Sequence, residues 1–281
     1  MSKTFTKEDV ILNKKEAIKS LNKLLESYIN DSTRSHLKKA NLISYWLKDF
    51  VQYIRFEEKF DPIKNISYKR GNIVKVNFGF NVGSEYGGLH YAIILDNHNS
   101  HNSPVITLIP LTSIKDDKAV HSNNVELGNE IYKALKLKYD AISKSLKEEQ
   151  YEIAKTLQTF DVFLKMSLKL ASELIGSDEN SEEFEEKLIE TKTYIQQAKE
   201  LMNAWEEKDR HNKEEQIYLD KIGQEISQMK EGSIALVNQI TTVSKMRIYD
   251  PRNAKGVLSG ISLSETGMEK INKKMKDLYI F

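Results

Sequence analysis

Cysteine is absent from this chain of 281 residues, which excludes disulfide bonds, thiolate catalysis and cysteine-ligated zinc. Neither sign of charge is in excess. The 42 Lys and Arg residues and 41 Asp and Glu residues give a formal net charge of +1, so any surface that binds nucleic acid must be local. No apolar run is long enough to cross a bilayer, and the first residues lack the apolar core of a signal peptide. We therefore expect a cytoplasmic protein without membrane contacts.

Proline and glycine are scarce and unevenly placed. No proline occurs between Pro110 and Pro251, whereas five of the 12 glycines lie between Gly71 and Gly88. Because both residues interrupt regular structure, their distribution divides the chain into helical and strand-rich blocks.

Two blocks show helical periodicity. In residues 1–62, two apolar stripes separated by Asn30-Asp31-Ser32 predict an N-terminal helical hairpin. In residues 129–231, apolar residues on a 4-3 spacing predict two long antiparallel helices packed as a coiled coil. The second of these contains no apolar residue between Glu206 and Gln216, so we expect weak packing or a kink there.

Strand patterns occur on both sides of the predicted coiled coil. The expected strands include Val74–Phe78, Tyr91–Leu95, Val105–Ile109, Val125–Leu127, Ile234–Val237 and Val257–Ile261. Ser262 and Glu265 fit a capping box for a last helix. Neither strand block has enough strands to close a core alone. The sequence thus predicts an α+β fold, with one small β domain (residues 68–128 plus 232–281) into which the coiled coil is inserted.

The densest cluster of chemically distinctive residues is the segment GSEYGGLH, from Gly83 to His90, which precedes a buried-looking strand. Glycines this close together indicate a loop with unusual backbone angles or close approach to a ligand. A histidine at the start of a strand is suited to acid–base chemistry near neutral pH. The loop matches neither a P-loop nor a dinucleotide-binding fingerprint.

Four short motifs, in order, resemble those of the MazF/PemK toxins of type II toxin–antitoxin systems. They are RGNIV from Arg70, VGSEYGG from Val82, PLTS from Pro110 and NQITTV from Asn238. The corresponding family patterns are RGD, VGSEQGG-x-RP, P-[IL]-T-[SA] and DQIRT. The resemblance covers residues 70–127 and 232–280, and leaves out the N-terminal hairpin and the insertion.

This resemblance implies an SH3-like β-barrel with a C-terminal helix, usually in a homodimer, and an antitoxin protein as partner. It also implies a metal-independent endoribonuclease, with no cofactor, that cuts single-stranded RNA. In such enzymes the 2′-hydroxyl attacks the adjacent phosphodiester and leaves a cyclic phosphate and a 5′-hydroxyl. That reaction needs a base, an acid and donors for the phosphorane charge.

The resemblance assigns Thr112 to the active site. The family's catalytic arginine falls on His90, which we interpret as a candidate acid or base, and its following proline falls on Tyr91. Thr241 replaces the DQIRT arginine. The candidate RNA-binding residues lie in the glycine loop and at nearby basic or polar positions: Arg70, Ser84, Glu85, Tyr86, Gly87, Gly88, Lys115, Gln239 and Lys245.

Other interpretations remain open at this stage. Asp96, His98, His101 and His121 lack the spacing of a metal site, and no metal is expected. The loss of both family arginines favours an alternative in which a weakly active or inactive barrel serves as an RNA- or protein-binding module. A further hypothesis is self-inhibition, in which residues 1–62 cover the RNA groove as an antitoxin segment would.

Overall fold

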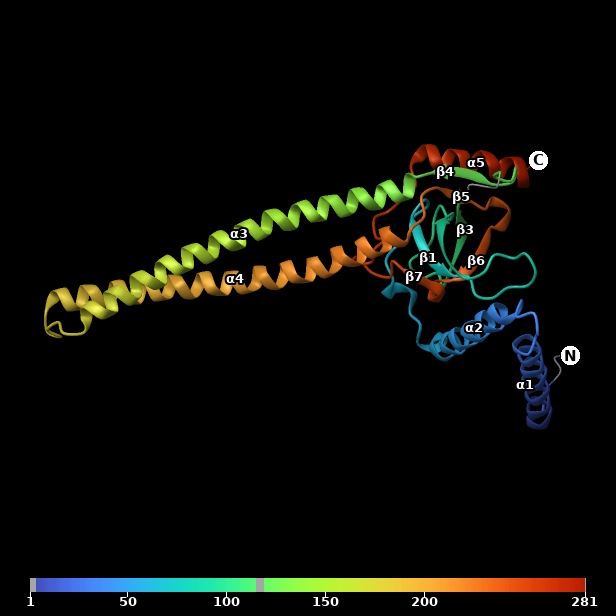
Figure 1. Cartoon of the computed structure of the whole chain (residues 1–281), viewed down its shortest axis with the longest axis horizontal. Coiled ribbons are helices and arrows are strands. Elements are labelled where there is room, and N and C mark those ends of the chain that lie inside the picture. The colour runs from blue at the N-terminus through green and yellow to red at the C-terminus, as the bar shows by residue number, and fades with distance from the viewer. Residues whose placement is uncertain (1–3, 115–118, 281) are drawn as a thin grey trace.

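The computed structural model describes residues 4–114 and 119–280, which form an antiparallel sheet, a long helical arm and an N-terminal pair of helices (Figure 1). The predicted α+β class is thereby confirmed. The strands are β1 (Ile73–Asn77), β2 (Leu89–Ile94), β3 (Val105–Ser113), β4 (Val125–Gly128), β5 (Ser233–Ala235), β6 (Thr241–Ser244) and β7 (Ile248–Asp250).

The sheet combines strands from both sides of the insertion. Its order is β4-β5-β3-β2-β1-β7, and β6 also pairs with β3. The long strand β3 makes this possible: its first half pairs with β6 (Val105 with Ser244) and its second half with β5 (Thr112 with Ile234). Between the described strands there is no pairing of β4 with β7, so the sheet is curved but is not a closed barrel.

Alternate residues of the strands point to opposite faces of the sheet, and both faces are buried. One face contains Val74, Val76, Ala92 and Ile248 and packs against Phe78 and Tyr68. The other face carries a second core, which is shared with the helices and includes Ile73, Ile93, Ile131, Leu135, Ile222 and Ile271. The second core therefore ties the helical arm and the last helix to the sheet.

The arm consists of α3 (Glu130–Leu174) and α4 (Glu182–Gln228), which run antiparallel and extend away from the sheet (Figure 1). Helix α4 is continuous through the stretch that lacks apolar residues. There Asn212 is buried and its amide nitrogen lies 3.1 Å from the Glu149 carboxylate of α3, while His211 lies 3.2 Å from the other oxygen of that carboxylate. Polar contacts therefore join the two helices where the apolar seam is interrupted.

The N-terminal helices α1 (Lys7–Ile29) and α2 (Leu37–Phe56) lie where the sequence predicts them, but they do not form a side-by-side hairpin. Helix α1 contributes no buried residue, and Val10 and Ile18 are 56% and 59% exposed. In Figure 1, α1 runs at a steep angle to α2 and away from the sheet. Only α2 packs against the β domain.

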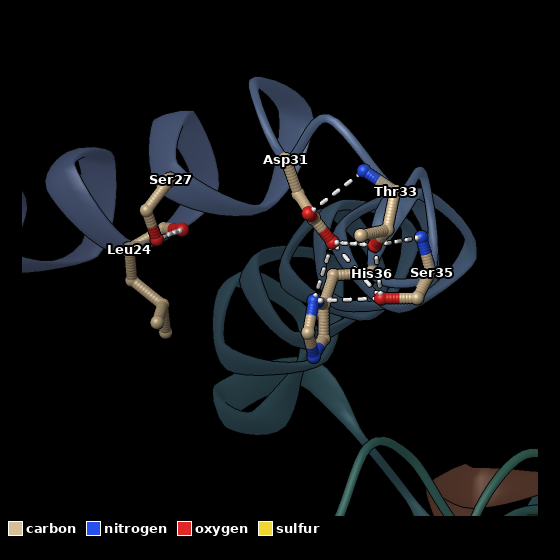
Figure 2. A network of polar contacts seen from close by, with 6 residues as sticks. All are labelled: Leu24, Ser27, Asp31, Thr33, Ser35 and His36. Atoms are coloured by element: carbon tan, nitrogen blue, oxygen red, sulfur yellow. Dashed lines mark hydrogen bonds and ion pairs between the residues drawn. The ribbon is translucent and has the colours of Figure 1, made fainter.

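A polar network fixes the turn between these two helices (Figure 2). The Asp31 carboxylate accepts hydrogen bonds from the hydroxyls of Thr33 and Ser35, at 2.8 and 2.9 Å, and lies 2.8 Å from Nδ1 of His36. These partners, His36 first, hold the pKa of Asp31 well below its usual range. Because His36 is the residue before α2, the network sets the direction in which α2 leaves the turn.

The last helix, α5 (Glu265–Tyr279), begins at Ser264, whose hydroxyl accepts a hydrogen bond from the backbone N–H of Gly267. The predicted cap at Ser262 is therefore wrong by two residues. The expected strand Val257–Ile261 is a turn that buries Leu258 and Ile261. Among the described helices, none is both long and apolar enough to cross a membrane.

Candidate functional site

The loop between β1 and β2 has glycines where a side chain would not fit. A Cβ atom at Gly87 would lie 2.7 Å from the carbonyl oxygen of Gly79. Gly88 has a φ of +92°, a conformation that other L-residues rarely adopt. The Glu85 carboxylate braces the loop by accepting a hydrogen bond from the backbone N–H of Val82. The backbone conformation of the loop therefore requires glycine at positions 87 and 88, and the role of Glu85 in this structure is to stabilise the loop.

His90 is the second residue of β2 and pairs with Val76 of β1. Its half-buried ring lies 4.6 Å from the ring of Tyr86, measured between centroids. Burial lowers the pKa of His90 below its ordinary value of 6.5, and a hydrogen bond with the Gly87 backbone has a smaller, opposite effect. His90 is therefore neutral at pH 7, so one of its ring nitrogens can accept a proton.

Tyr86 connects His90 to β3. The Tyr86 hydroxyl donates a 2.6 Å hydrogen bond to the carbonyl oxygen of Leu111, and the Tyr86 ring meets the edge of Phe78. Burial raises the pKa of the Tyr86 phenol to about 12, against a smaller effect of the Thr112 side chain. The half-buried Thr112, which follows Leu111 on β3, thus neighbours the same tyrosine that lies against His90. Tyr86 brings the two predicted catalytic residues to one region of the protein.

Gln239, at the end of the short helix η3 (Val237–Gln239), holds the glycine loop from the other side. Its Oε1 accepts a hydrogen bond from the backbone N–H of Tyr86 at 3.3 Å, and its Nε2 donates to the carbonyl oxygen of Ser84 at 3.4 Å. Both ends of the amide are therefore engaged with the loop. Gln239 and Ser84, both predicted to bind RNA, contact each other here, and the contact orients the loop.

Two basic residues predicted to bind RNA lie elsewhere. Arg70 bonds to the carbonyl oxygen of Leu95 and to Asn272 of α5, at the end of the β1–β2 pair opposite His90. The Lys245 side chain is only 1% exposed, and its ammonium group donates to the carbonyl oxygen of Ser100 at 3.0 Å. The structure does not bring either cation to the glycine loop. Lys115, the third predicted cation, lies outside the described residues.

Helix α2 forms a wall opposite the glycine loop. Trp46 of α2 lies against Arg247, whose guanidinium carbon is 5.1 Å from the indole centroid. The same guanidinium donates a 2.8 Å hydrogen bond to the carbonyl oxygen of Asn77. Asp49 of α2 in turn accepts a 2.8 Å hydrogen bond from the Asn77 amide. A Cβ at Gly79 would lie 2.7 Å from Trp46, so this glycine permits the close approach of the helix.

A groove of about 760 Å³ lies between α2 and the glycine loop. Its lining on the β domain includes Phe80, Asn81, Glu85, Gly88 and His90, and its lining on α2 includes Lys38, Lys39, Leu42, Tyr45, Trp46 and Asp49. Sequence reasoning placed residues 1–62 over the RNA groove only as an inhibitory segment, and it assigned no individual residue of α2 to the site. The available signal was the 3-4 spacing of Lys38, Leu42, Tyr45 and Asp49, which places them on one face of a helix.

Metal ligation has little support in this part of the chain. Within residues 4–114 and 119–280, no group of three or more His, Cys, Asp or Glu side chains is arranged to hold a metal ion. His101, one of the weak candidates, instead places its Nε2 2.6 Å from the carbonyl oxygen of Asn65. The chemistry that the groove offers is that of a neutral imidazole, hydroxyl groups, amides and lysines.

Comparison with known families places the glycine loop in context. Residues 69–156 match the family model described as the PemK-like, MazF-like toxin of type II toxin–antitoxin systems. The match contains β1 to β4, Thr112 and the first part of α3, and it leaves residues 232–281 and the N-terminal helices outside. A search of curated proteins found no match. The resemblance is confirmed over residues 69–156, which contain the first three short motifs, and the fourth motif, at Asn238, lies outside the match.

Proposed function

We propose that this protein is a metal-independent endoribonuclease that cleaves single-stranded RNA. The observation that carries the proposal is the arrangement around Tyr86, in which the ring of His90 lies 4.6 Å away and the phenol reaches β3 beside Thr112. The proposal also draws on the toxin family match at residues 69–156. The site combines a candidate base, a hydroxyl donor and a loop whose backbone can approach a phosphate closely.

In the proposed reaction, His90 accepts the proton of the RNA 2′-hydroxyl because its lowered pKa keeps it neutral at pH 7. The 2′-oxygen then attacks the adjacent phosphorus, and the bond between phosphorus and the 5′-oxygen breaks. The products are a cyclic phosphate and a 5′-oxygen that takes up a proton from solvent. We assign to the Thr112 hydroxyl the role of hydrogen-bond donor to the phosphorane oxygens.

The wider proposals follow from the same family. We propose that the curved sheet is a variant of the SH3-like barrel, formed by residues 68–128 plus 232–281, with residues 129–231 as an inserted arm and residues 1–62 as an N-terminal unit. A homodimer, an antitoxin partner and a cytoplasmic location remain predictions of this proposal.

A second candidate is a binding module without catalysis. One observation favours it: Arg247, which lies against the α2 wall of the groove, and Arg70, which the sequence predicts to bind RNA, are both engaged in contacts within the protein. The Arg247 guanidinium bonds to the carbonyl oxygens of Asn77 and Phe78, and Arg70 bonds to Leu95 and Asn272. An arginine is a strong stabiliser of phosphorane charge, so a site without a free one would bind RNA better than it cleaves it.

Cleavage of a long unstructured RNA in EDTA tests the proposal. We expect the full-length protein to release fragments whose 5′ ends are phosphorylated directly by polynucleotide kinase, as 5′-hydroxyl ends are. The His90→Ala and Thr112→Ala variants should lose this activity, and His98→Ala, at an exposed position in a turn, should keep it. RNA binding without cleavage by the intact protein would favour the binding module.

A further inference from the structure

Helix α2 forms the second wall of the groove beside the glycine loop. It lies outside the family match, and the proposed reaction assigns no role to it. Helix α2 is attached through its middle, where Trp46 meets Arg247 and Asp49 meets Asn77. Toward its beginning the helix leaves a hollow between itself and the loop, bounded by Lys38 and Lys39. A helix that plugged the site would fill this space, whereas α2 leaves it open.

The open part of this wall is basic. Lys38 and Lys39 are exposed and line the groove, and neither forms an ion pair with a carboxylate among the described residues. The two acidic residues of the lining are engaged with the protein, since Asp49 bonds to Asn77 and Glu85 bonds within its own loop. The lining as a whole thus holds two lysines and two carboxylates, and its positive charge is confined to the beginning of α2, at Lys38 and Lys39.

The wall also presents an aromatic ring. Tyr45 lines the groove, and its side chain is 59% exposed. It follows Lys38 by seven residues, which places the two on the same face of α2 at a separation of about 10 Å along the helix axis. An exposed aromatic ring beside lysines is the combination that binds single-stranded nucleic acid, with bases on the ring and phosphates on the cations.

We propose that α2 is the second wall of a site for single-stranded RNA. Lys38 and Lys39 bind phosphates, Tyr45 stacks on a base, and the strand between them faces His90 across the groove. These residues supply the positive charge that Arg70 and Lys245 do not bring to the loop. The inference rests on the proposed function in one respect, that RNA is the ligand of the site.

Binding of a labelled single-stranded RNA whose 2′-hydroxyls are all methylated tests this inference apart from catalysis, because such an RNA cannot undergo 2′-hydroxyl attack. Its dissociation constant is measured by fluorescence anisotropy over a range of salt concentrations. The full-length Lys38→Ala/Lys39→Ala variant is compared with Lys14→Ala/Lys15→Ala, which removes the same charge from an exposed pair on α1.

We expect the Lys38→Ala/Lys39→Ala variant to bind more weakly and its salt slope to fall by about 1.4, since each phosphate contact to a single strand contributes about 0.7. The Lys14→Ala/Lys15→Ala control should match the unmodified protein. Loss of one stacking contact in Tyr45→Ala should weaken binding roughly 5- to 150-fold, and Tyr45→Phe should restore it.

Equal RNA affinity and equal salt slope for the two double variants would overturn the inference. The groove would then be a binding site for a protein segment. Tighter RNA binding or faster cleavage by Lys38→Ala/Lys39→Ala would also overturn it, in favour of self-inhibition by the N-terminal helices. If the protein cleaves RNA and both double variants behave alike, only this inference fails. If RNA binds through α2 without cleavage, only the nuclease proposal fails, and a protein that binds no RNA would refute both.

Discussion

Replacing Tyr86 by phenylalanine removes one hydroxyl group and keeps the ring that lies against His90. In the structure this hydroxyl donates a 2.6 Å hydrogen bond to the carbonyl oxygen of Leu111. A typical hydrogen bond contributes about 0.5–1.5 kcal/mol net, and a buried acceptor left without a partner costs about 1–3 kcal/mol. We therefore expect Tyr86→Phe to lower the free energy of unfolding by about 1–2 kcal/mol.

Urea unfolding followed by tryptophan fluorescence measures this difference. Tyr151→Phe is the matched control, because the Tyr151 side chain is 70% exposed and its change should stay within about 0.5 kcal/mol. Equal unfolding midpoints for Tyr86→Phe and the unmodified protein at pH 7 would refute the structural role given to this phenol.

The same variant isolates a pH dependence. Burial raises the pKa of Tyr86 from 10.0 to about 12, so the neutral phenol is favoured in the folded state. The stabilisation it contributes is complete below pH 10 and is lost as the pH rises through 12. We expect the stability difference between the unmodified protein and Tyr86→Phe to shrink over this interval. A difference that stays constant up to pH 12 would contradict the assignment.

Three further predictions concern the glycine loop and its neighbours. Because burial lowers the pKa of His90 below 6.5, the rate of RNA cleavage should rise with pH and reach half of its maximum below pH 6.5, as measured by initial rates. A rate that falls as the pH rises over this range would exclude His90 as the base. Lys245→Met should lower the free energy of unfolding by about 1–3 kcal/mol, since two backbone carbonyls lose their donor, without a change in RNA affinity; weaker RNA binding by the folded variant would place Lys245 in the site. Gly87→Ala forces a Cβ to within 2.7 Å of the Gly79 carbonyl oxygen, so RNA binding should be lost while the unfolding transition remains cooperative; full binding would show that the loop tolerates the shift.

Sequence patterns predicted most helices and strands of the fold, because the hydrophobic periodicity of each segment largely determines its secondary structure. The alternation around Val74 and the apolar run from Tyr91 correspond to β1 and β2, and the 4-3 spacing in residues 129–231 corresponds to α3 and α4. Strand β7 was missed because three residues are too few for a periodic signal, and it is a strand only through pairing with β1. The run Val257–Ile261 is apolar because its turn packs into the second core.

The site was predictable only in part. The glycine loop, His90 and Thr112 stood out because their residue types and order are unusual. The places of Arg70 and Lys245 depend on long-range contacts, with Asn272 in one case and with Ser100 in the other, and no local pattern reports them. The contribution of α2 was hidden for the same reason, because its approach depends on Trp46 meeting Arg247.

The insertion of α3 and α4 has a consequence for how the chain folds. Strands β4 and β5 pair directly, Val125 with Ala235, although the whole arm separates them in the sequence. Closing a flexible loop of that length would cost about 4 kcal/mol in chain entropy. The arm reduces this cost, because α3 and α4 can pair step by step from the turn that joins them. Each step closes only a short loop, and the completed pair holds the ends of β4 and β5 close together. We therefore expect the helical arm to form early, as a local folding unit, and the pairing of β4 with β5 to follow it.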